Sequence, residues 1–237
     1  MSWKTEHRSF YYALAPEPDD PVLDPATTAL LVIDVQNTYL ERPDRASLAT
    51  EAERAHYDGW TPFHERTHGT AIPNIAELLA LFRAKGIERL FARIACRTLD
   101  GRDRSLSQKK PGFNNLLLPK DEHASQMVAA LAPEGDEITV IKTTDSALTG
   151  TNLRLILSNL GIRTVICVGI FTDQCVSSTV RSLADESFDV VVLEDCCAAA
   201  TDELHRQELA IINMIYCNVM RLADLKALMK LELEPAQ

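Results

Sequence analysis

The sequence lacks long apolar runs and an excess of basic residues. No stretch reaches the roughly 18 to 20 apolar residues that span a bilayer, and the first residues, MSWKTEHRSFYY, lack the apolar core of a signal peptide. The 24 Lys and Arg residues face 34 Asp and Glu residues, which gives a formal net charge of -10. Such an acidic balance argues against nucleic acid or an anionic membrane as a partner. We therefore expect a cytoplasmic protein that binds neither.

The cysteines do not form a CxxC motif, although the chain has 6 of them. Cys96 and Cys167 lie in predicted strands and Cys217 near the end of a predicted helix, where a thiol packs as a small apolar group. We interpret the pair at 196–197 as packing residues too. Cys175 is then the thiol whose position favours a chemical role.

Apolar runs of strand length alternate with stretches of helical periodicity, a pattern typical of a parallel sheet with crossover helices. Strands are predicted at 28–34, 88–95, 137–142, 163–170, 189–194 and about 217–220. Helices are predicted at 72–85, 122–131, 151–160, 172–187, 202–216 and 223–231. We expect one α/β domain over residues 26–237, preceded by an aromatic N-terminal arm, residues 1–25, that packs on the domain or on a neighbouring subunit.

Two polar segments, 37–70 and 97–120, do not fit the alternation. Both follow predicted strands on the side of the sheet where Asp34 ends the first strand. Long irregular loops there are expected to form pocket walls or lids.

The first of these segments contains His64-Glu65-Arg66-Thr67-His68, which matches the HExxH pattern of zinc peptidases. That pattern requires a stable helix, but Pro62 precedes it closely and Gly69 follows it directly. We interpret the segment as an ordinary loop or lid. A zinc peptidase is the weaker alternative, and we expect no metal and no cofactor.

Three chemically useful side chains follow predicted strands. Asp34 and Lys142 end the strands LLVID and ITVIK, and Cys175 lies at the start of the helix that follows TVICVGI. The carboxyl ends of parallel strands meet at one edge of a sheet, where ligands bind. A thiol at a helix N-terminus also faces unpaired N–H groups and the positive end of the helix dipole, which favour the thiolate. We predict that the three side chains converge.

Together these groups can hydrolyse an amide. Cys175 would attack a carbonyl carbon, Asp34 would take the thiol proton and pass it to the leaving amine, and Lys142 would hold both charges in place. Water would then hydrolyse the thioester. Asp34 or Lys142 alone would more often be structural, as a cap or a surface lysine, so the prediction depends on their coming together with Cys175.

The motifs that carry these residues resemble those of the isochorismatase-like cysteine hydrolases. They are ALLVIDVQN, IKTTDSALTGTNL and GIFTDQCVSSTVRSLAD, in the order and spacing of that family. The resemblance implies a three-layer sandwich, a six-stranded parallel sheet with helices on both faces, and a dimer or tetramer. It implies Asp34, Lys142 and Cys175 as the catalytic triad. It also implies an oxyanion site formed by the N–H groups of Phe171 and Cys175, with a cis peptide between Ile170 and Phe171.

The resemblance also narrows the substrate. Isochorismate hydrolases lack a cysteine at the place of Cys175, so its presence favours C–N hydrolysis. Nicotinamidases carry metal-binding histidines after the second strand, where this chain reads RIACRTLDGRDRS. We expect an amidohydrolase acting on a small amide, ureido or carbamoyl compound, such as biuret, ureidoacrylate or an N-carbamoyl compound. The alternatives are a nicotinamidase or other hydrolase of the family, and a non-catalytic ligand-binding or redox-sensing protein on the same fold.

Several residues are candidates for substrate binding. The loop after the second strand carries Arg97, Arg102 and Arg104, and a guanidinium group suits a carboxylate or a ureido group. The alternative is a solvated basic loop. The other candidates for lining the pocket are Gln36, Asn37, Ile170, Phe171, Asn213 and Tyr216.

Overall fold

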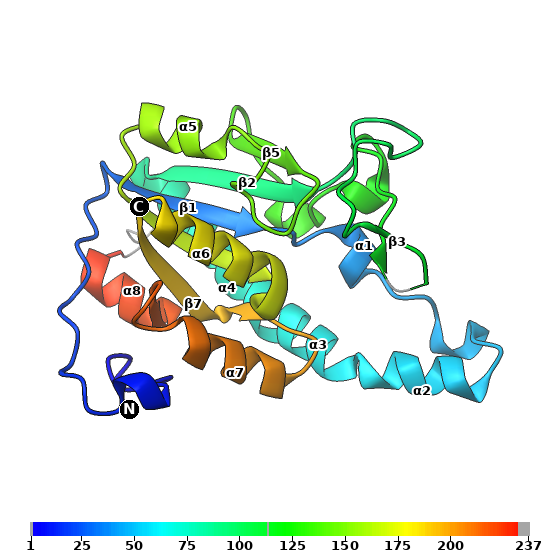
Figure 1. Cartoon of the computed structure of the whole chain (residues 1–237), viewed down its shortest axis with the longest axis horizontal. Helices are drawn as coiled ribbons and strands as arrows, with labels where there is room; N and C mark the ends of the chain where they lie inside the picture. Colours follow the sequence, from blue (N-terminus) through cyan, green and yellow to red (C-terminus); the bar gives the residue numbers. More distant parts are fainter. Residues whose placement is uncertain (1, 113, 232–237) are drawn as a thin grey trace, which may run out of the picture.

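The computed structural model describes residues 2–112 and 114–231, so the last six residues of the predicted domain lie outside the described residues. Six strands form one parallel sheet in the order β5-β2-β1-β6-β7-β8 (Figure 1). Their bounds are β1 Thr28–Ile33, β2 Glu88–Ile94, β5 Ile138–Lys142, β6 Thr164–Ile170, β7 Asp189–Ala198 and β8 Asn218–Met220. A small antiparallel pair, β3 Lys109–Lys110 and β4 Asn114–Asn115, lies outside this sheet.

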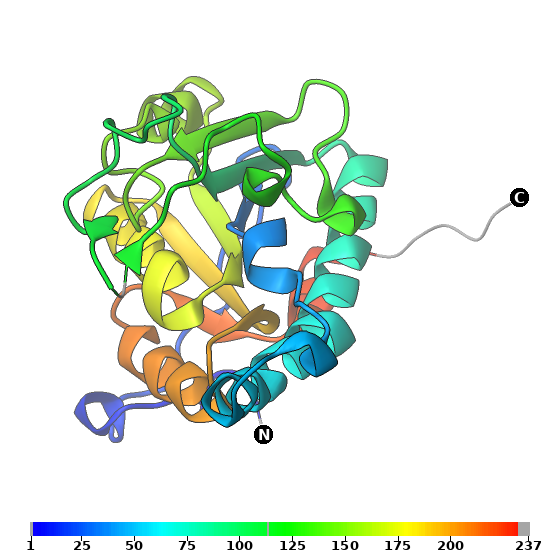
Figure 2. The same cartoon turned by 90° about the vertical axis from the view of Figure 1, so that its right-hand side faces the viewer.

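Helices cover both faces of the sheet (Figure 2), so the predicted α/β sandwich is confirmed. The α-helices are α1 Asn37–Leu40, α2 Glu51–Gly59, α3 Thr61–Arg66, α4 Ile72–Lys85, α5 Leu153–Asn159, α6 Ser177–Asp185, α7 Asp202–Ile212 and α8 Leu222–Met229. Shorter turns are η1 Phe10–Tyr12, η2 Arg45–Ser47, η3 Thr67–Ala71, η4 His123–Ser125, η5 Ala129–Leu131 and η6 Thr172–Val176. Within the described ranges, no helix has the length and apolar character needed to cross a bilayer.

Strand β1 is buried on both sides and separates two apolar layers. Leu31 belongs to the layer that contains Leu157 of α5 and Val180 of α6. Leu30 belongs to the opposite layer, which contains Leu78 of α4. Because successive side chains of a strand point to opposite faces, a central strand needs apolar residues at every position. This explains the unbroken sequence TALLVI.

The predicted helix at 122–131 is wrong, because only the turns η4 and η5 form there. The backbone between these turns pairs with the segment that follows β1. The N–H of Asn37 donates to the Gln126 carbonyl at 3.0 Å, and the N–H of Val128 donates to the Val35 carbonyl at 2.9 Å. These bonds require extended backbone at 126–128, which a continuous helix does not allow.

The irregular structure predicted for 37–70 is also wrong, because much of this segment is helical. Helix α2 starts with a reciprocal capping box between Thr50 and Glu53. Pro62 lies in the first turn of α3, where a backbone N–H would make no hydrogen bond within the helix, so a proline is tolerated there. The turn η3 is π-helical and leads from α3 directly into α4. The HERTH segment is therefore helical, and the rings of His64 and His68 stack at 5.9 Å.

Strand β7 is longer than the predicted 189–194, because a register shift opposite β6 lets it continue. After the shift Cys197 pairs with Gly169. Both Cys196 and Cys197 are fully buried, as expected for packing residues. The pair therefore lies inside the sheet.

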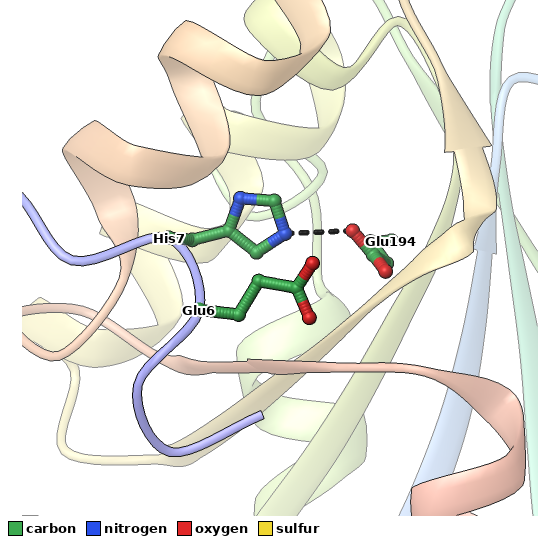
Figure 3. A group of neighbouring side chains, drawn as sticks. All are labelled: Glu6, His7 and Glu194. Carbon is green, nitrogen blue, oxygen red and sulfur yellow. Dashed lines mark hydrogen bonds and ion pairs between the residues drawn. The ribbon is translucent and has the colours of Figure 1, made fainter. Parts of the chain in front are cut away.

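The N-terminal residues are held against the middle of β7 by charged side chains. His7 Nε2 lies 2.6 Å from Glu194 Oε2, and Figure 3 shows the Glu6 carboxylate beside this pair. Arg221 contacts both carboxylates, at 2.5 Å from Glu194 and 3.1 Å from Glu6. Phe10 and Tyr11 of η1, by contrast, are 92% and 88% exposed.

Candidate active site

Three side chains meet at the carboxyl edge of the sheet. Asp34 directly follows β1, Lys142 is the last residue of β5, and Cys175 lies in η6 immediately after β6. The Lys142 ammonium lies 2.7 Å from Asp34 Oδ2. The Cys175 thiol is close enough to both groups to affect their pKa values. The structure thus brings together the three residues that the strand ends predicted.

Asp34 is held in an unusual backbone conformation, with φ at 53°. Its Oδ1 accepts a hydrogen bond from the N–H of Ile94 at 2.8 Å, and its Oδ2 faces Lys142. The side chains of Asp34 and Lys142 are only 2% and 0% exposed. Each of these buried charges stabilises the other, since a charge that is buried without a partner of opposite sign is strongly unfavourable.

A close approach of β6 to β1 sets the relative position of Asp34 and Cys175. Gly169 has φ at 123°, and a Cβ atom added there would lie 2.0 Å from the Ile33 carbonyl oxygen. Only glycine fits such a contact. The strand that leads to Cys175 can therefore pass directly beside the strand that leads to Asp34.

Burial and the Asp34 charge raise the pKa of the Cys175 thiol well above its ordinary value while Lys142 only partly opposes them, which favours the protonated thiol. This upward shift opposes the thiolate that a helix N-terminus favours. Burial also raises the pKa of Asp34, against the effect of Lys142. For Lys142, burial favours the neutral form, but Asp34 and Cys175 outweigh it and raise the pKa. The thiol proton must therefore leave during attack, and Asp34 is an acceptor beside it.

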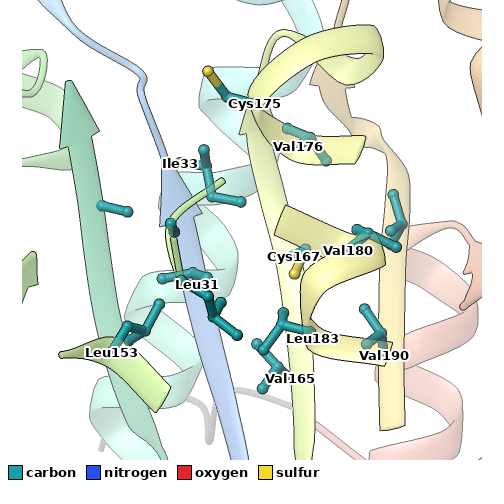
Figure 4. Close-up of a cluster of buried hydrophobic side chains, with 14 of the residues drawn as sticks. Leu31, Ile33, Leu153, Val165, Cys167, Cys175, Val176, Val180, Leu183 and Val190 are labelled. Atoms are coloured by element: carbon teal, nitrogen blue, oxygen red, sulfur yellow. The ribbon is translucent and has the colours of Figure 1, made fainter. Parts of the chain in front are cut away.

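A cavity of about 520 Å³ opens beside Cys175. Figure 4 shows Cys175 at the outer end of the apolar layer, with its sulfur turned away from Leu31 and Val165. Ile170 and Phe171 line the cavity as predicted, and the peptide between them is cis. The lining residues are Asp34, Tyr39, Trp60, Ile94, Asn114, Leu116, Asp145, Ile170, Phe171, Asp173, Gln174, Cys175 and Ser178.

The segment 37–70 supplies an aromatic wall of this cavity, so its predicted role as a pocket wall agrees with the structure. The Phe171 ring lies 5.4 Å from Tyr39, 5.9 Å from Trp60 and 5.0 Å from Phe63. Tyr39, Trp60 and Phe171 also line a second cavity of about 430 Å³. The Tyr39 ring meets Phe171 edge to face and the other two rings are tilted against it, and packed rings of this kind form an apolar surface for a ligand.

Two acidic residues of the cavity were missed by the sequence analysis. Asp145 Oδ1 lies 3.9 Å from the Cys175 sulfur. Asp173 lines the same cavity from η6. Both belong to the motifs that carry Lys142 and Cys175, so their short separation along the chain was the available signal.

Gln36 and Asn37 do not line the cavity, which corrects the expectation that they bind substrate. The Gln36 amide donates to the carbonyls of Ile94 and Ser125 at 2.8 and 2.7 Å. The Asn37 amide donates to the His123 carbonyl at 2.9 Å. These amides join the segment after β1 to neighbouring backbone, which requires them to point into the protein.

The three arginines of the basic loop do not line the cavity either. Arg104 donates to the carbonyls of Gly101 and Leu116, so it organises the loop itself. Arg102 pairs with Asp100 at 3.2 Å, and Arg97 is exposed. The same loop contributes Asn114 and Leu116 to the cavity instead.

Asn213 and Tyr216 lie elsewhere because α7 ends at Ile212, short of the predicted helix 202–216. The Asn213 amide donates to the carbonyls of Glu6 and His7, and its oxygen accepts from the N–H of Val219. The Tyr216 ring lies under the Arg181 guanidinium at 5.3 Å. The expected pocket role of both residues is therefore wrong.

Among the residues that the structure describes, one group has the spacing of a metal site. It consists of Glu6, His7 and Glu194 and lines a different cavity from Cys175. Arg221 already supplies a positive charge to both carboxylates. We interpret the group as an ion-pair clamp for the N-terminal segment.

Comparison with known proteins agrees with this geometry. Residues 28–224 match the family model described as Isochorismatase domain. The chain belongs to the isochorismatase family. Ureidoacrylate amidohydrolase RutB of Methylobacterium radiotolerans is 30% identical over 223 residues, covering 86% of this chain and 80% of that protein. The isochorismatase family protein YecD of Escherichia coli O157:H7 is 30% identical over 212 residues, covering 87% of this chain and 97% of that protein.

The fold is shared with solved members of the isochorismatase family. A crystal structure of a family protein from Desulfovibrio vulgaris matches with a TM-score of 0.68 at 25% identity, covering 86% of this chain and 98% of that chain. The family predicted from the three motifs is therefore confirmed.

Proposed function

We propose that this protein is a cysteine-dependent amidohydrolase that cleaves a C–N bond of a small amide, ureido or carbamoyl compound. The observation that carries the proposal is the buried pair of Asp34 and Lys142 beside the Cys175 thiol at a cavity. The relative named ureidoacrylate amidohydrolase, at 30% identity, supports this class of reaction. Biuret, ureidoacrylate and N-carbamoyl compounds are the substrates to test first.

The first step forms a C–S bond. The Cys175 sulfur attacks the substrate carbonyl carbon while its proton passes to Asp34. The carbonyl electron pair moves to oxygen, and we assign the N–H groups of Phe171 and Cys175 to that oxyanion. Losing one such donor typically costs about 2.7–4 kcal/mol. Lys142 stays protonated and keeps the neighbouring charges balanced.

The second step breaks the C–N bond. Asp34 returns its proton to the leaving nitrogen, the carbonyl re-forms, and ammonia or an amine departs, leaving a thioester on Cys175. Asp34 then takes a proton from water, whose oxygen attacks the thioester. The C–S bond breaks, the acid is released, and Asp34 returns the proton that it took from water to the sulfur.

A nicotinamidase is the second candidate because the wall formed by Tyr39, Trp60 and Phe171 can hold a flat ring. A redox-sensing role is less favoured. Burial and the Asp34 charge raise the Cys175 pKa, and a low-pKa thiol oxidises more readily.

Ammonia release from a panel of substrates tests the proposal. The panel contains nicotinamide, biuret, ureidoacrylate and N-carbamoyl amino acids. We expect turnover of at least one ureido or carbamoyl compound by the wild type and Cys96→Ala, and none by Cys175→Ser. Turnover that survives in Cys175→Ser would refute the thiol mechanism, and turnover of nicotinamide alone would favour the second candidate.

A further inference from the structure

The cavity beside Cys175 is lined by carboxylates. Asp34, Asp145 and Asp173 all border it, but only Asp34 has a cation at its side. Within the described ranges, neither Asp145 nor Asp173 forms an ion pair. Asp173 Oδ1 is buried and lacks a hydrogen-bond partner in the described protein. Such an acceptor is unfavourable unless a ligand or solvent group donates to it.

Positive side chains are absent from the lining of this cavity, as far as the described residues show. Lys142 lies behind Asp34, is 0% exposed, and is already paired. The nearest cation of the adjoining cavity is Arg42, whose guanidinium lies 3.4 Å from the centre of the Tyr57 ring. The charged side chains that line the cavity are therefore all carboxylates, beside the neutral polar groups of Asn114, Gln174 and Ser178.

The aromatic wall of the cavity also favours a positively charged ligand. Tyr39, Trp60 and Phe171 present rings whose faces are negative and attract cations. Burial raises the pKa of Tyr39, and the charges of Asp34 and Asp145 raise it further. The phenol thus lies in a negative field, which comes from the same carboxylates.

We propose that this site selects amide or ureido substrates that carry an ammonium or amidinium group near the scissile carbonyl, with Asp145 and Asp173 as the residues that determine this specificity. The inference rests on the proposed function for the cleavage itself. Among the small amide, ureido and carbamoyl compounds of that function, it favours those that carry a cationic group over neutral ones and over those that carry a carboxylate. The geometry supports it because Asp145 Oδ1 lies 3.9 Å from the attacking sulfur, which places this carboxylate beside the position that the scissile carbonyl must occupy.

Three amides of similar length test the inference: β-alaninamide, which is cationic, neutral butanamide, and anionic succinamate. Their binding to Cys175→Ser is measured by ligand-observed NMR, so that the result does not depend on turnover. We expect β-alaninamide to bind at least about tenfold more tightly than butanamide, because a charge-assisted contact is worth that much or more. Succinamate should bind most weakly.

Two isosteric changes identify the residues. In the Cys175→Ser background, Asp145→Asn and Asp173→Asn should each reduce the preference for β-alaninamide severalfold. Asp136→Asn, at an exposed position, should leave it unchanged. If both variants still prefer β-alaninamide to butanamide, these carboxylates are not the groups that select the cationic substrate.

The remaining outcomes are decisive as well. Equal binding of the three amides, tighter binding of succinamate, or no binding of β-alaninamide would overturn the inference. Tight binding of succinamate would indicate that its carboxylate reaches Arg42. If β-alaninamide binds as expected but wild-type enzyme hydrolyses no amide or ureido compound, the proposed function fails while the charge preference stands.

Discussion

Lys142 and Asp34 form an ion pair with 2.7 Å between Nζ and Oδ2, at a place where both side chains are shielded from water. The pair joins β5 to the end of β1, across the intervening strand β2. Each charge there depends on the other for its stability.

Removing the lysine should therefore destabilise the fold as well as the activity. We expect Lys142→Met to lower the free energy of unfolding by about 3–5 kcal/mol, because it leaves a buried carboxylate unpaired. Urea denaturation measures this loss. The double variant Asp34→Asn/Lys142→Met should recover most of the stability without recovering turnover. Failure to recover would mean that the lysine acts through packing and not through its charge.

Replacing the nucleophile should separate chemistry from folding. We expect Cys175→Ser to reduce kcat by roughly a thousandfold or more, since the hydroxyl is a much weaker nucleophile in the same place. Its unfolding midpoint should stay close to that of the wild type. Cys96→Ala is the matched control, because this thiol is buried but lies outside the lining of the Cys175 cavity. Similar losses of kcat in both variants would contradict the assignment of Cys175.

The pH dependence of kcat/KM should follow the ionisation of Asp34. The attacking thiol needs a carboxylate to accept its proton, so activity should be lost when Asp34 is protonated. Burial raises the pKa of Asp34 above its ordinary value of 3.8. We therefore expect an acidic limb in which the rate rises with pH, with its midpoint above 3.8. A rate that is flat down to that pH would exclude Asp34 as the base.

Glu137 should contribute stability that disappears in acid. Burial acts to raise its pKa, but hydrogen bonds and ion pairs with Arg83 and Arg89 prevail and lower it from 4.5 to about 2. Because the folded pKa is depressed, the contribution is complete above pH 4.5 and is lost as the pH falls toward 2. We expect Glu137→Gln to lower the free energy of unfolding at pH 7 by about 1–3 kcal/mol.

The measurement for Glu137 is urea unfolding at pH 7 and at pH 2.5. The difference between wild type and Glu137→Gln should shrink at the lower pH. Glu134→Gln serves as the control, because that carboxylate is mostly exposed, with 69% of its side chain accessible. A variant that is equally destabilised at both pH values would point to lost packing.

The exposed aromatic residues of the N-terminal segment should support a homo-oligomer. Phe10 and Tyr11 are 92% and 88% exposed, and such apolar surface favours association. We expect the wild type to be a dimer or tetramer and Phe10→Ser/Tyr11→Ser to dissociate at lower protein concentration. Light scattering coupled to size exclusion measures the mass. An unchanged mass in the double variant would place the subunit contact elsewhere.

The parallel sheet and the meeting of Asp34, Lys142 and Cys175 follow from local sequence. Unbroken apolar runs such as TALLVI can be satisfied only by a strand buried on both faces. Residues that end parallel strands then share one edge whatever the loops do. The raised pKa of Cys175 does not follow in this way, because it depends on burial and on the Asp34 charge supplied by another strand.

Tertiary contacts decided the walls and the charge of the cavity. The extended backbone at 126–128 depends on hydrogen bonds to Val35 and Asn37, which are distant along the chain. The hydrogen bonds of Arg104 to the carbonyls of Gly101 and Leu116 depend on how its own loop folds. The composition of a loop does not reveal which hydrogen-bond partners its side chains will have in the folded protein. The arginines were therefore the expected substrate contacts, whereas Asp145 and Asp173 line the cavity. Sequence alone determined the three reacting groups, because they lie at or just after the ends of parallel strands. The packing of the loops decided which other side chains line the cavity.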